Sequence, residues 1–175
     1  MKHNTAVLFW STLAVLIFTK GLASPLLKAL SNSESGISVA RSVWIMSRNS
    51  RSLIRVRGTS VDGNGVKTDE SGKLLELESK RYNGSVYVRI RSVTENSYLC
   101  VNDAGDLTVE VHGNIFTQCL FTEDTFSGYR TFQSIKNSTW YLGFKRSGKV
   151  KQPHNTTFSQ KAARFVTYFS LSSIP

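Results

Sequence analysis

The feature that most constrains the fold of this chain is an internal repeat of about 45 residues. The apolar segments Tyr98–Val101 and Tyr141–Phe144 are each followed by a glycine and an aliphatic residue at the same spacing, with an offset of 43 residues. A fainter copy, Leu53–Val56, begins 45 residues before Tyr98. Companion apolar positions are also 45 residues apart: Leu75, Leu120 and Phe165. Because one such unit cannot bury its apolar face alone, the three units are expected to close on a shared core.

Short segments of β-type residues fill much of the remaining chain. Apolar and polar residues alternate most clearly after Asn83-Gly84, a dipeptide typical of tight hairpins. No segment has a convincing helical period. The expected strands lie at residues 43–46, 53–56, 74–78, 86–90, 98–101, 107–111, 119–123, 129–133, 141–144 and 163–169. About twelve short strands in three repeats predict an all-β fold, the closed three-lobed barrel called a β-trefoil. A sandwich without internal symmetry is the alternative.

The amino terminus has the features of a secretory signal. Lys2 makes the start positive, residues 6–18 are apolar, and the small residues Gly21 and Ala23 suit cleavage after Ala23. This apolar run has 13 residues, whereas a membrane-spanning helix needs about 20. We therefore expect a secreted, extracellular protein without membrane insertion, and a retained signal anchor is the less favoured alternative. The predicted organisation is a signal peptide at 1–23, a flexible leader at 24–41, a β-trefoil domain at 42–170 and a tail at 171–175.

Positive charge is concentrated in the last third of the chain. The formal net charge is +10, yet residues 24–124 carry 12 basic and 12 acidic side chains, which balance. Residues 125–175 carry 8 basic side chains and no acidic one. The excess charge therefore belongs to one region, which suggests a polyanionic partner for that region.

The stretch from Tyr141 to Ala162 is the strongest candidate for such a binding surface. An apolar strand leads into a basic turn centred on Gly148, a polar loop follows, and the stretch ends on Gln160-Lys161-Ala162. Closely spaced cations on two loops of one face would add their fields and attract a sulfated polysaccharide. An ordinary solvated basic turn is the alternative.

Cysteine usage and three sequons agree with export. Cys100 and Cys119 permit one intramolecular disulfide in an oxidising compartment. Glycosylation acceptors begin at Asn83, Asn137 and Asn155.

No enzymatic, metal or cofactor site is expected. His112 and His154 have no partner spacing for a metal or a catalytic triad and are expected at the surface. No nucleophile elbow, phosphate loop or acid pair is present, so no catalytic residue is assigned. The export signal argues against nucleic acid as the partner. A secreted β-trefoil lectin or protease inhibitor remains an alternative, although no tryptophan has the Gln-x-Trp context of trefoil lectins.

Four segments together resemble a fibroblast growth factor. These are Tyr98–Asn102, Cys119–Glu123, Trp140–Gly148 and Gln160–Ala162, and the resemblance extends from Trp44 to about Tyr168. The cysteine pair and the turn at residues 47–50 are most similar to the paracrine subfamily with bridged cysteines, which implies a Cys100–Cys119 disulfide. Insect viruses and invertebrates also encode growth factors of this type, so the source is left open. The resemblance implies a secreted ligand of a fibroblast growth factor receptor tyrosine kinase, with heparan sulfate as co-ligand, acting as a monomer or a heparin-linked dimer.

The resemblance also implies which residues bind these partners. Heparin-binding positions correspond to Asn49, Lys145, Arg146, Ser147, Lys149, Lys151, Gln160, Lys161 and Ala162. Receptor-binding positions correspond to Met46, Lys67, Glu123, Tyr129, Val166 and Tyr168. Met46 stands where the family has a tyrosine, and Asn155 stands where it commonly has a basic residue.

Overall fold

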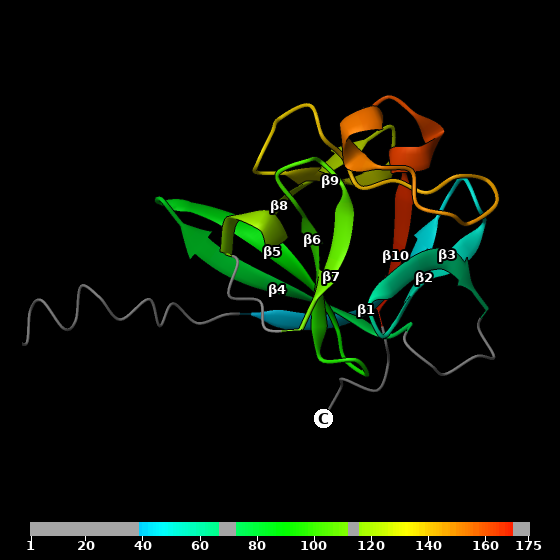
Figure 1. The fold of residues 1–175 in the computed structure, drawn as a ribbon, viewed down its shortest axis with the longest axis horizontal. Coiled ribbons are helices and arrows are strands. Elements are labelled where there is room, and N and C mark those ends of the chain that lie inside the picture. Colours follow the sequence, from blue (N-terminus) through cyan, green and yellow to red (C-terminus); the bar gives the residue numbers. More distant parts are fainter. Residues whose placement is uncertain (1–38, 67–72, 112–115, 170–175) are drawn as a thin grey trace, which may run out of the picture. The chain divides into compact units, whose positions relative to one another are not determined.

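Ten strands pair antiparallel in a single sheet, and six of them close into a barrel (Figure 1). The computed structural model describes residues 39–66, 73–111 and 116–169, all of which belong to one compact unit, residues 35–175. The strands are β1 (Ala40–Ser47), β2 (Ser52–Arg57), β3 (Ser60–Gly65), β4 (Leu75–Tyr82), β5 (Ser85–Ser92), β6 (Ser97–Val101), β7 (Leu107–Glu110), β8 (Phe121–Phe126), β9 (Tyr129–Ser134) and β10 (Phe165–Phe169). Three short 3-10 helices are present, η1 (Phe116–Cys119), η2 (Pro153–Asn155) and η3 (Lys161–Ala163). In this described part of the chain, no helix is long and apolar enough to cross a membrane.

The pairing of the strands makes the barrel a closed ring. β1 pairs with β4, β4 with β5, β5 with β8, β8 with β9, β9 with β10, and β10 returns to β1. A closed ring leaves none of these six strands as a free edge. The β2–β3 and β6–β7 hairpins are joined to the ring through β1 and β5. The all-β prediction is confirmed.

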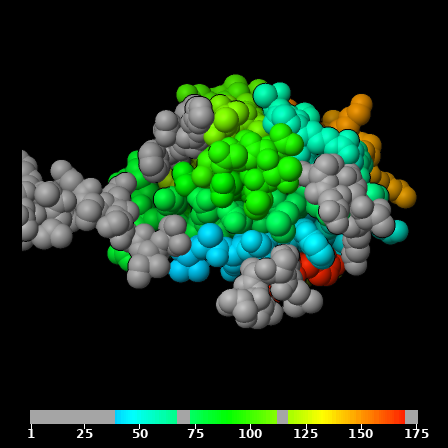
Figure 2. All heavy atoms as spheres, turned by 90° about the horizontal axis from the view of Figure 1, so that it is seen from below, coloured from blue at the N-terminus to red at the C-terminus, as the bar shows by residue number. Residues whose placement is uncertain are grey.

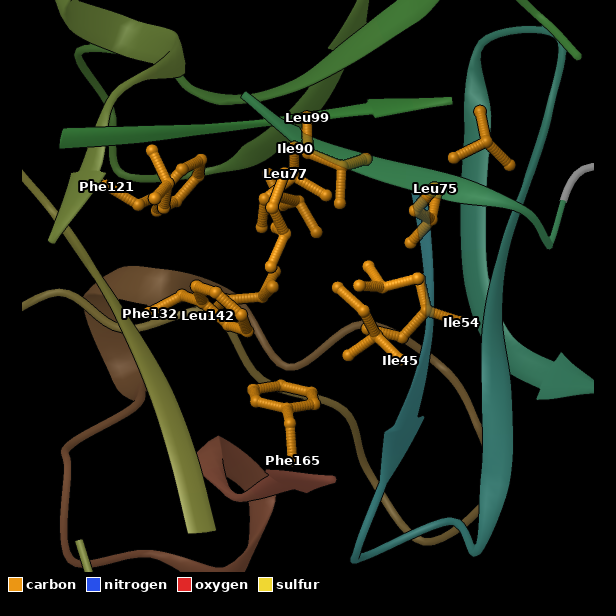
Figure 3. Packing of buried hydrophobic residues seen from close by; sticks show 14 of the residues in the cluster. Ile45, Ile54, Leu75, Leu77, Ile90, Leu99, Phe121, Phe132, Leu142 and Phe165 are labelled. Carbon is orange, nitrogen blue, oxygen red and sulfur yellow. The ribbon is translucent and has the colours of Figure 1, made fainter. Parts of the chain in front are cut away.

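Equivalent residues of the three repeats meet in one core (Figure 3). Ile54, Leu99 and Leu142 occupy the same place in each repeat, and each is 0% exposed. The residues two positions later are also completely buried: Val56, Val101 and Phe144. Figure 3 shows side chains from all three units pointing into the same space. The predicted shared core is thus present, and each unit supplies part of the apolar surface that the other two cover.

The companion positions differ from the predicted spacing in the second unit. Leu75 and Phe165 lie in the core cluster at the starts of β4 and β10, as expected. Leu120 is fully buried but lies outside that cluster, and Phe121, the first residue of β8, takes the core position. The expected strand at 119–123 begins late because Cys119 ends η1. Neighbouring side chains on a strand point to opposite faces, so a shift of one residue places Phe121, and not Leu120, in the core cluster.

The third unit lacks one of the expected hairpins. About twelve strands were predicted, whereas the described residues form ten. Where the third hairpin was expected, the structure has only isolated bridges, Phe144 with Val150 and Gln133 with Tyr141. The return segment is cut short by Pro153, which has no N–H to donate to a ladder and begins η2.

Two local predictions concern the ends of elements. The Asn83-Gly84 hairpin is confirmed, because both residues have positive φ, 47° and 79°, between β4 and β5. β1 begins at Ala40, so its first two residues lie within the predicted leader. The signal peptide, the leader up to residue 38 and the tail lie outside the described residues, and they stay predictions.

The implied disulfide is confirmed. Cys100 in β6 and Cys119 in η1 are bridged, with their Cα atoms 4.0 Å apart and a separation of 19 positions in the sequence. Both cysteines are 0% exposed. The bridge ties η1, and with it the start of β8, to β6.

Removing this bridge should lower the free energy of unfolding. A Cys100→Ala/Cys119→Ala variant is expected to lose about 3 kcal/mol, because the unfolded chain regains the freedom of the closed loop. Chemical denaturation of both proteins measures the difference. A loss below about 1 kcal/mol would show that the loop is already constrained in the unfolded chain.

Candidate functional site

Backbone hydrogen bonds fix the basic turn at residues 145–151 while four of its side chains face solvent. The Lys145 N–H donates to Lys149 O at 2.8 Å, and the Gly148 N–H donates to Lys145 O at 2.9 Å. Gly148 has φ of 76°, a conformation that suits glycine, and its carbonyl accepts a 2.8 Å hydrogen bond from the Gly63 N–H. The four exposed predicted residues of this turn are Lys145, Arg146, Ser147 and Lys149.

Two further segments are fastened to this turn through one residue, Phe144. Its carbonyl accepts a 2.9 Å hydrogen bond from Asn49 Nδ2, in the β1–β2 turn. Its N–H donates to Ala162 O at 3.1 Å. The β1–β2 turn, the basic turn and the segment at 160–162 therefore meet, and together we call residues 48–51, 145–151 and 160–162 the basic surface. Figure 1 shows the orange loops of this surface beside the cyan hairpin of the first unit.

A hollow of about 340 Å³ lies within the basic surface. It is lined by Asn49, Ser50, Arg51, Arg146 and Lys161. Three of these residues were predicted as heparin-binding, and the structure brings them together from three separate segments. Ser50 and Arg51 were not predicted. Their only sequence signal is that they follow Asn49 in the same turn.

The charges of the basic surface are largely uncompensated. In residues 39–66, 73–111 and 116–169, no carboxylate forms an ion pair with Lys145, Arg146, Lys149 or Lys161. Lys151 differs, because its ammonium group donates to Gln160 Oε1. Ala162 is only 6% exposed, so its role in the surface is to supply the backbone carbonyl that Phe144 uses. Next to the surface, partial burial and the nearby Asp124 carboxylate raise the pKa of Tyr141.

The polar loop that follows the turn is held against the second unit. Gln152 Oε1 accepts a 2.9 Å hydrogen bond from the Leu107 N–H, and the His154 N–H donates to Gly105 O at 3.2 Å. His154 Nδ1 lies 3.0 Å from the same Gly105 oxygen. His154 is exposed, as expected, and His112 lies outside the described residues. The described residues contain no cluster of His, Cys, Asp or Glu that could hold a metal ion.

A second surface, apolar in character, is formed where β1 and β10 pair. Met46 lies opposite Val166, and Trp44 lies opposite Tyr168. Met46 and Tyr168 also line a hollow of about 230 Å³ together with Arg51, Ser52, Leu53, Gly65 and Val66. We call these residues the apolar hollow. Figure 2 shows the red atoms of β10 against the blue strip of β1 on this side of the molecule.

Tyr129 and Glu123, also predicted as receptor-binding, do not line the apolar hollow. Tyr129 is half-buried beneath Arg48, whose guanidinium carbon lies 4.4 Å from the ring centroid. Glu123 is 10% exposed and contacts Arg41 and Arg130, the latter at 3.0 Å. Its carboxylate is thus already paired within the barrel. Lys67 lies outside the described residues.

All three glycosylation acceptors are exposed. Asn83 is at the tip of the β4–β5 hairpin, and Asn155 ends η2. Asn137 Oδ1 accepts hydrogen bonds from the N–H and the hydroxyl of Thr139, both at 2.8 Å. Occupancy of the three sites stays a prediction.

Comparison with known proteins identifies the family to which these surfaces belong. Residues 41–166, almost the whole described barrel, match the family model described as Fibroblast growth factor. The chain belongs to the fibroblast growth factor family. The family is a β-trefoil, so the predicted fold is confirmed, and its members are signalling ligands rather than enzymes.

Several family members are similar to this chain over most of its length. Fibroblast growth factor 17 from Homo sapiens is 25% identical over 136 residues, which is 77% of this chain and 61% of the relative. Fibroblast growth factor 18 from Homo sapiens is 29% identical over 123 residues, 70% of this chain and 58% of the relative. Fibroblast growth factor 8b from Danio rerio is 29% identical over 130 residues, 73% of this chain and 59% of the relative. The matched region thus spans about three fifths of each relative.

The contact between Gly105 and the loop at 152–155 leads to a prediction. A Cβ atom on Gly105 would lie 2.7 Å from His154 Cβ, and the residue has φ of 80°. Gly105→Ala should therefore lower the free energy of unfolding by about 2–4 kcal/mol, measured by chemical denaturation, through backbone strain and overpacking.

Gly84→Ala is the matched control for this variant. Gly84 has φ of 79° but no atom within 4 Å of the added Cβ, so only the backbone strain, about 1 kcal/mol, is expected. Equal losses for the two variants would mean that the contact with His154 does not constrain the loop.

Proposed function

We propose that this chain is a secreted growth factor that binds heparan sulfate through the basic surface and a fibroblast growth factor receptor tyrosine kinase through the apolar hollow and its surroundings. The observation that carries the proposal is the hollow of about 340 Å³, in which cations from separate segments converge. Family membership supports both partners, and two of the predicted receptor-binding residues, Met46 and Tyr168, line the apolar hollow.

The basic surface suits a sulfated polysaccharide for physical reasons. Arg146 and Lys161 converge on one hollow, where no described carboxylate competes for them. Several like charges on one face raise the local concentration of a polyanion. Binding would release the counterions condensed on the polysaccharide, as it does for nucleic acids, so affinity should fall steeply with salt. The Asn49 amide has its own role, since it is already bonded to Phe144 O and fixes the turn.

The apolar hollow suits a protein partner. Tyr168 is 40% exposed, and Val66, which lines the same hollow, is 54% exposed. Exposed aromatic and aliphatic groups that border a hollow are frequent anchors of protein interfaces. Arg51, which also lines the apolar hollow, belongs to the basic surface as defined above. A polysaccharide and a receptor would therefore bind to neighbouring parts of the molecule.

Two sets of variants test the two halves of the proposal. Arg146→Gln/Lys161→Gln should reduce the dependence of heparin affinity on salt by about two charges, measured as the slope of log affinity against log salt. Met46→Ala/Tyr168→Ala should leave heparin affinity unchanged and reduce receptor phosphorylation, measured with and without heparin on cells that express single receptors. Each pair of substitutions alters one surface only, so each should weaken binding to one partner only.

Lys80→Gln/Arg81→Gln in β4 is the matched control, because it also removes two cations. Neither side chain forms an ion pair within the described residues, and the β4–β5 hairpin lies away from the orange loops in Figure 1. Equal loss of heparin binding in both charge variants would show that binding follows net charge. Absence of receptor phosphorylation by the unaltered protein would contradict the growth-factor half.

The third sequon adds a prediction about regulation of the basic surface. Thr156 is buried, and its hydroxyl donates to Gln152 O at 2.9 Å, with Lys151 O as a second acceptor 3.2 Å away. The residues on either side of it, Asn155 and Thr157, are exposed. A glycan on Asn155 would therefore project outward next to Lys151. Heparin should bind more weakly to the glycosylated form, Asn155→Gln should restore part of the affinity, and Asn155→Lys should restore more.

Salt elution from heparin, combined with glycopeptide mapping of secreted protein, measures this effect. The matched control is Asn83→Gln, which removes the acceptor of the distant β4–β5 hairpin. If Asn155 is occupied and enzymatic deglycosylation leaves the elution salt unchanged, the glycan does not affect this surface.

A further inference from the structure

The exposed loop at residues 157–159 carries one large apolar side chain, Phe158. Its ring lies edge-on to the ring of Phe126, the last residue of β8, with ring centroids 5.1 Å apart and an interplanar angle of 85°. The Tyr141 ring is a second neighbour, with centroids 6.3 Å apart. Phe158 is nevertheless 48% exposed. Edge-on aromatic pairs stabilise a structure beyond the area that they bury, so this contact holds the loop against the β8–β9 hairpin.

Arg164 reinforces the contact between the loop and the hairpin. Its guanidinium carbon lies 5.1 Å from the centroid of the Phe126 ring, within the range of a cation–aromatic attraction. Its Nη2 donates to the carbonyl of Ser159, the residue after Phe158, at 2.8 Å. One arginine thus contacts the ring on the hairpin and the backbone of the loop.

Only side chains connect this loop to the hairpin. Among the described residues, no backbone hydrogen bond joins residues 157–159 to β8 or β9. The loop is closed on itself instead, since the Gln160 N–H donates to Thr157 O at 3.1 Å. In Figure 1, β9 and the orange loops lie at the same end of the fold. The tip of the hairpin is therefore held beside the loop by the contacts of Phe126.

The two segments joined in this way carry residues predicted for different partners. Phe126 pairs with Tyr129 across the tip of the hairpin, and Tyr129 is one of the predicted receptor-binding residues. The loop continues directly into Gln160 and Lys161 of the basic surface. A ligand that orders one of two connected segments also restricts the other, which lowers the entropy that a second ligand must remove. The contact between Phe126 and Phe158 is thus placed to link binding at the two sites.

We propose that Phe158 is a positioning residue that links the two binding surfaces, because its contact with Phe126 holds the tip of the β8–β9 hairpin beside Gln160 and Lys161. This inference rests on the function proposed above and adds a route by which the two partners affect one another within this chain. A polysaccharide on the basic surface restricts the loop, and through the two rings it also orders Tyr129. By thermodynamic linkage, a protein bound at the hairpin raises the affinity for the polysaccharide by the same factor.

Hydrogen–deuterium exchange of the unliganded protein, read by mass spectrometry over residues 124–130, tests the contact itself. Phe158→Ala should speed exchange at the hairpin tip about five-fold, because an edge-on aromatic pair is lost. Phe126→Ala/Phe158→Ala should exchange no faster than Phe126→Ala alone, since the two rings act on each other. The matched control is Tyr82→Ala, which removes one ring of the Tyr82–Tyr87 pair of the β4–β5 hairpin and should leave residues 124–130 unchanged.

A second measurement tests the link between the surfaces. A heparin oligosaccharide should slow exchange at residues 124–130 in the unaltered protein and in Phe158→Tyr, which keeps the ring, but not in Phe158→Ala. All three proteins should bind the oligosaccharide with the same slope of log affinity against log salt, because no charge has been removed. A role of Phe158 in stability alone would lower the midpoint of thermal unfolding and leave the response to heparin intact.

The proposal is overturned if the hairpin exchanges at the same rate in Phe158→Ala and the unaltered protein, or if heparin slows that exchange equally in both. An unaltered protein that does not bind heparin would contradict the proposed function itself. Binding of heparin without any effect on the hairpin contradicts only the inference about Phe158.

Discussion

The backbone of Phe144 connects the binding surface to the core, and the arrangement of the surface depends on it. Its ring is 0% exposed and packs edge-on against Phe165, with ring centroids 6.2 Å apart. Its carbonyl and N–H hold Asn49 and Ala162, which come from two other segments. The ring cannot shift without opening a cavity in a closely packed interior. Three loops from different parts of the sequence are therefore kept in one arrangement by the packing of one side chain.

Without a bound polyanion, the clustered cations of the basic surface lower the stability of the folded state. The exposed cations of the basic surface repel one another, and the last third of the sequence contains no acidic residue to balance them. The rigid attachment at Phe144 prevents the loops from separating to relieve the repulsion. Any polyanion that binds only the folded state adds to the free energy of unfolding by mass action. Stability and binding are thus linked in this part of the fold.

Much of the architecture was predictable from periodicity, because buried positions must recur when three units share a core. Ile54, Leu99 and Leu142 were found in this way, from spacing alone. Periodicity failed at Leu120, because a single 3-10 turn moved the start of β8 by one residue. Periodicity also predicted a complete hairpin in the third unit, whereas the segment before Pro153 forms only the Phe144–Val150 bridge.

The candidate site was predicted less completely than the core. Arg146 and Lys161 were identified through the resemblance to the family, and the structure brings them to the same hollow. The role of Phe158 could not be found in that way, because its contacts with Phe126 and Tyr141 join segments that lie apart in the sequence. Glu123 was expected to be available to a partner, but whether a carboxylate already has arginine neighbours depends on strands that are distant in sequence.

The order in which the barrel strands pair has a consequence for folding during synthesis. β1 is among the first segments made and β10 is the last strand, yet these two strands are neighbours in the ring (Figure 1). Contacts between segments far apart in sequence form slowly, because a long loop must close before they contribute. The ring cannot close until residues 165–169 have been made, so a nascent chain remains open through most of its translation. Until that last strand has been added, the edge of β1 that pairs with β10 stays without a partner.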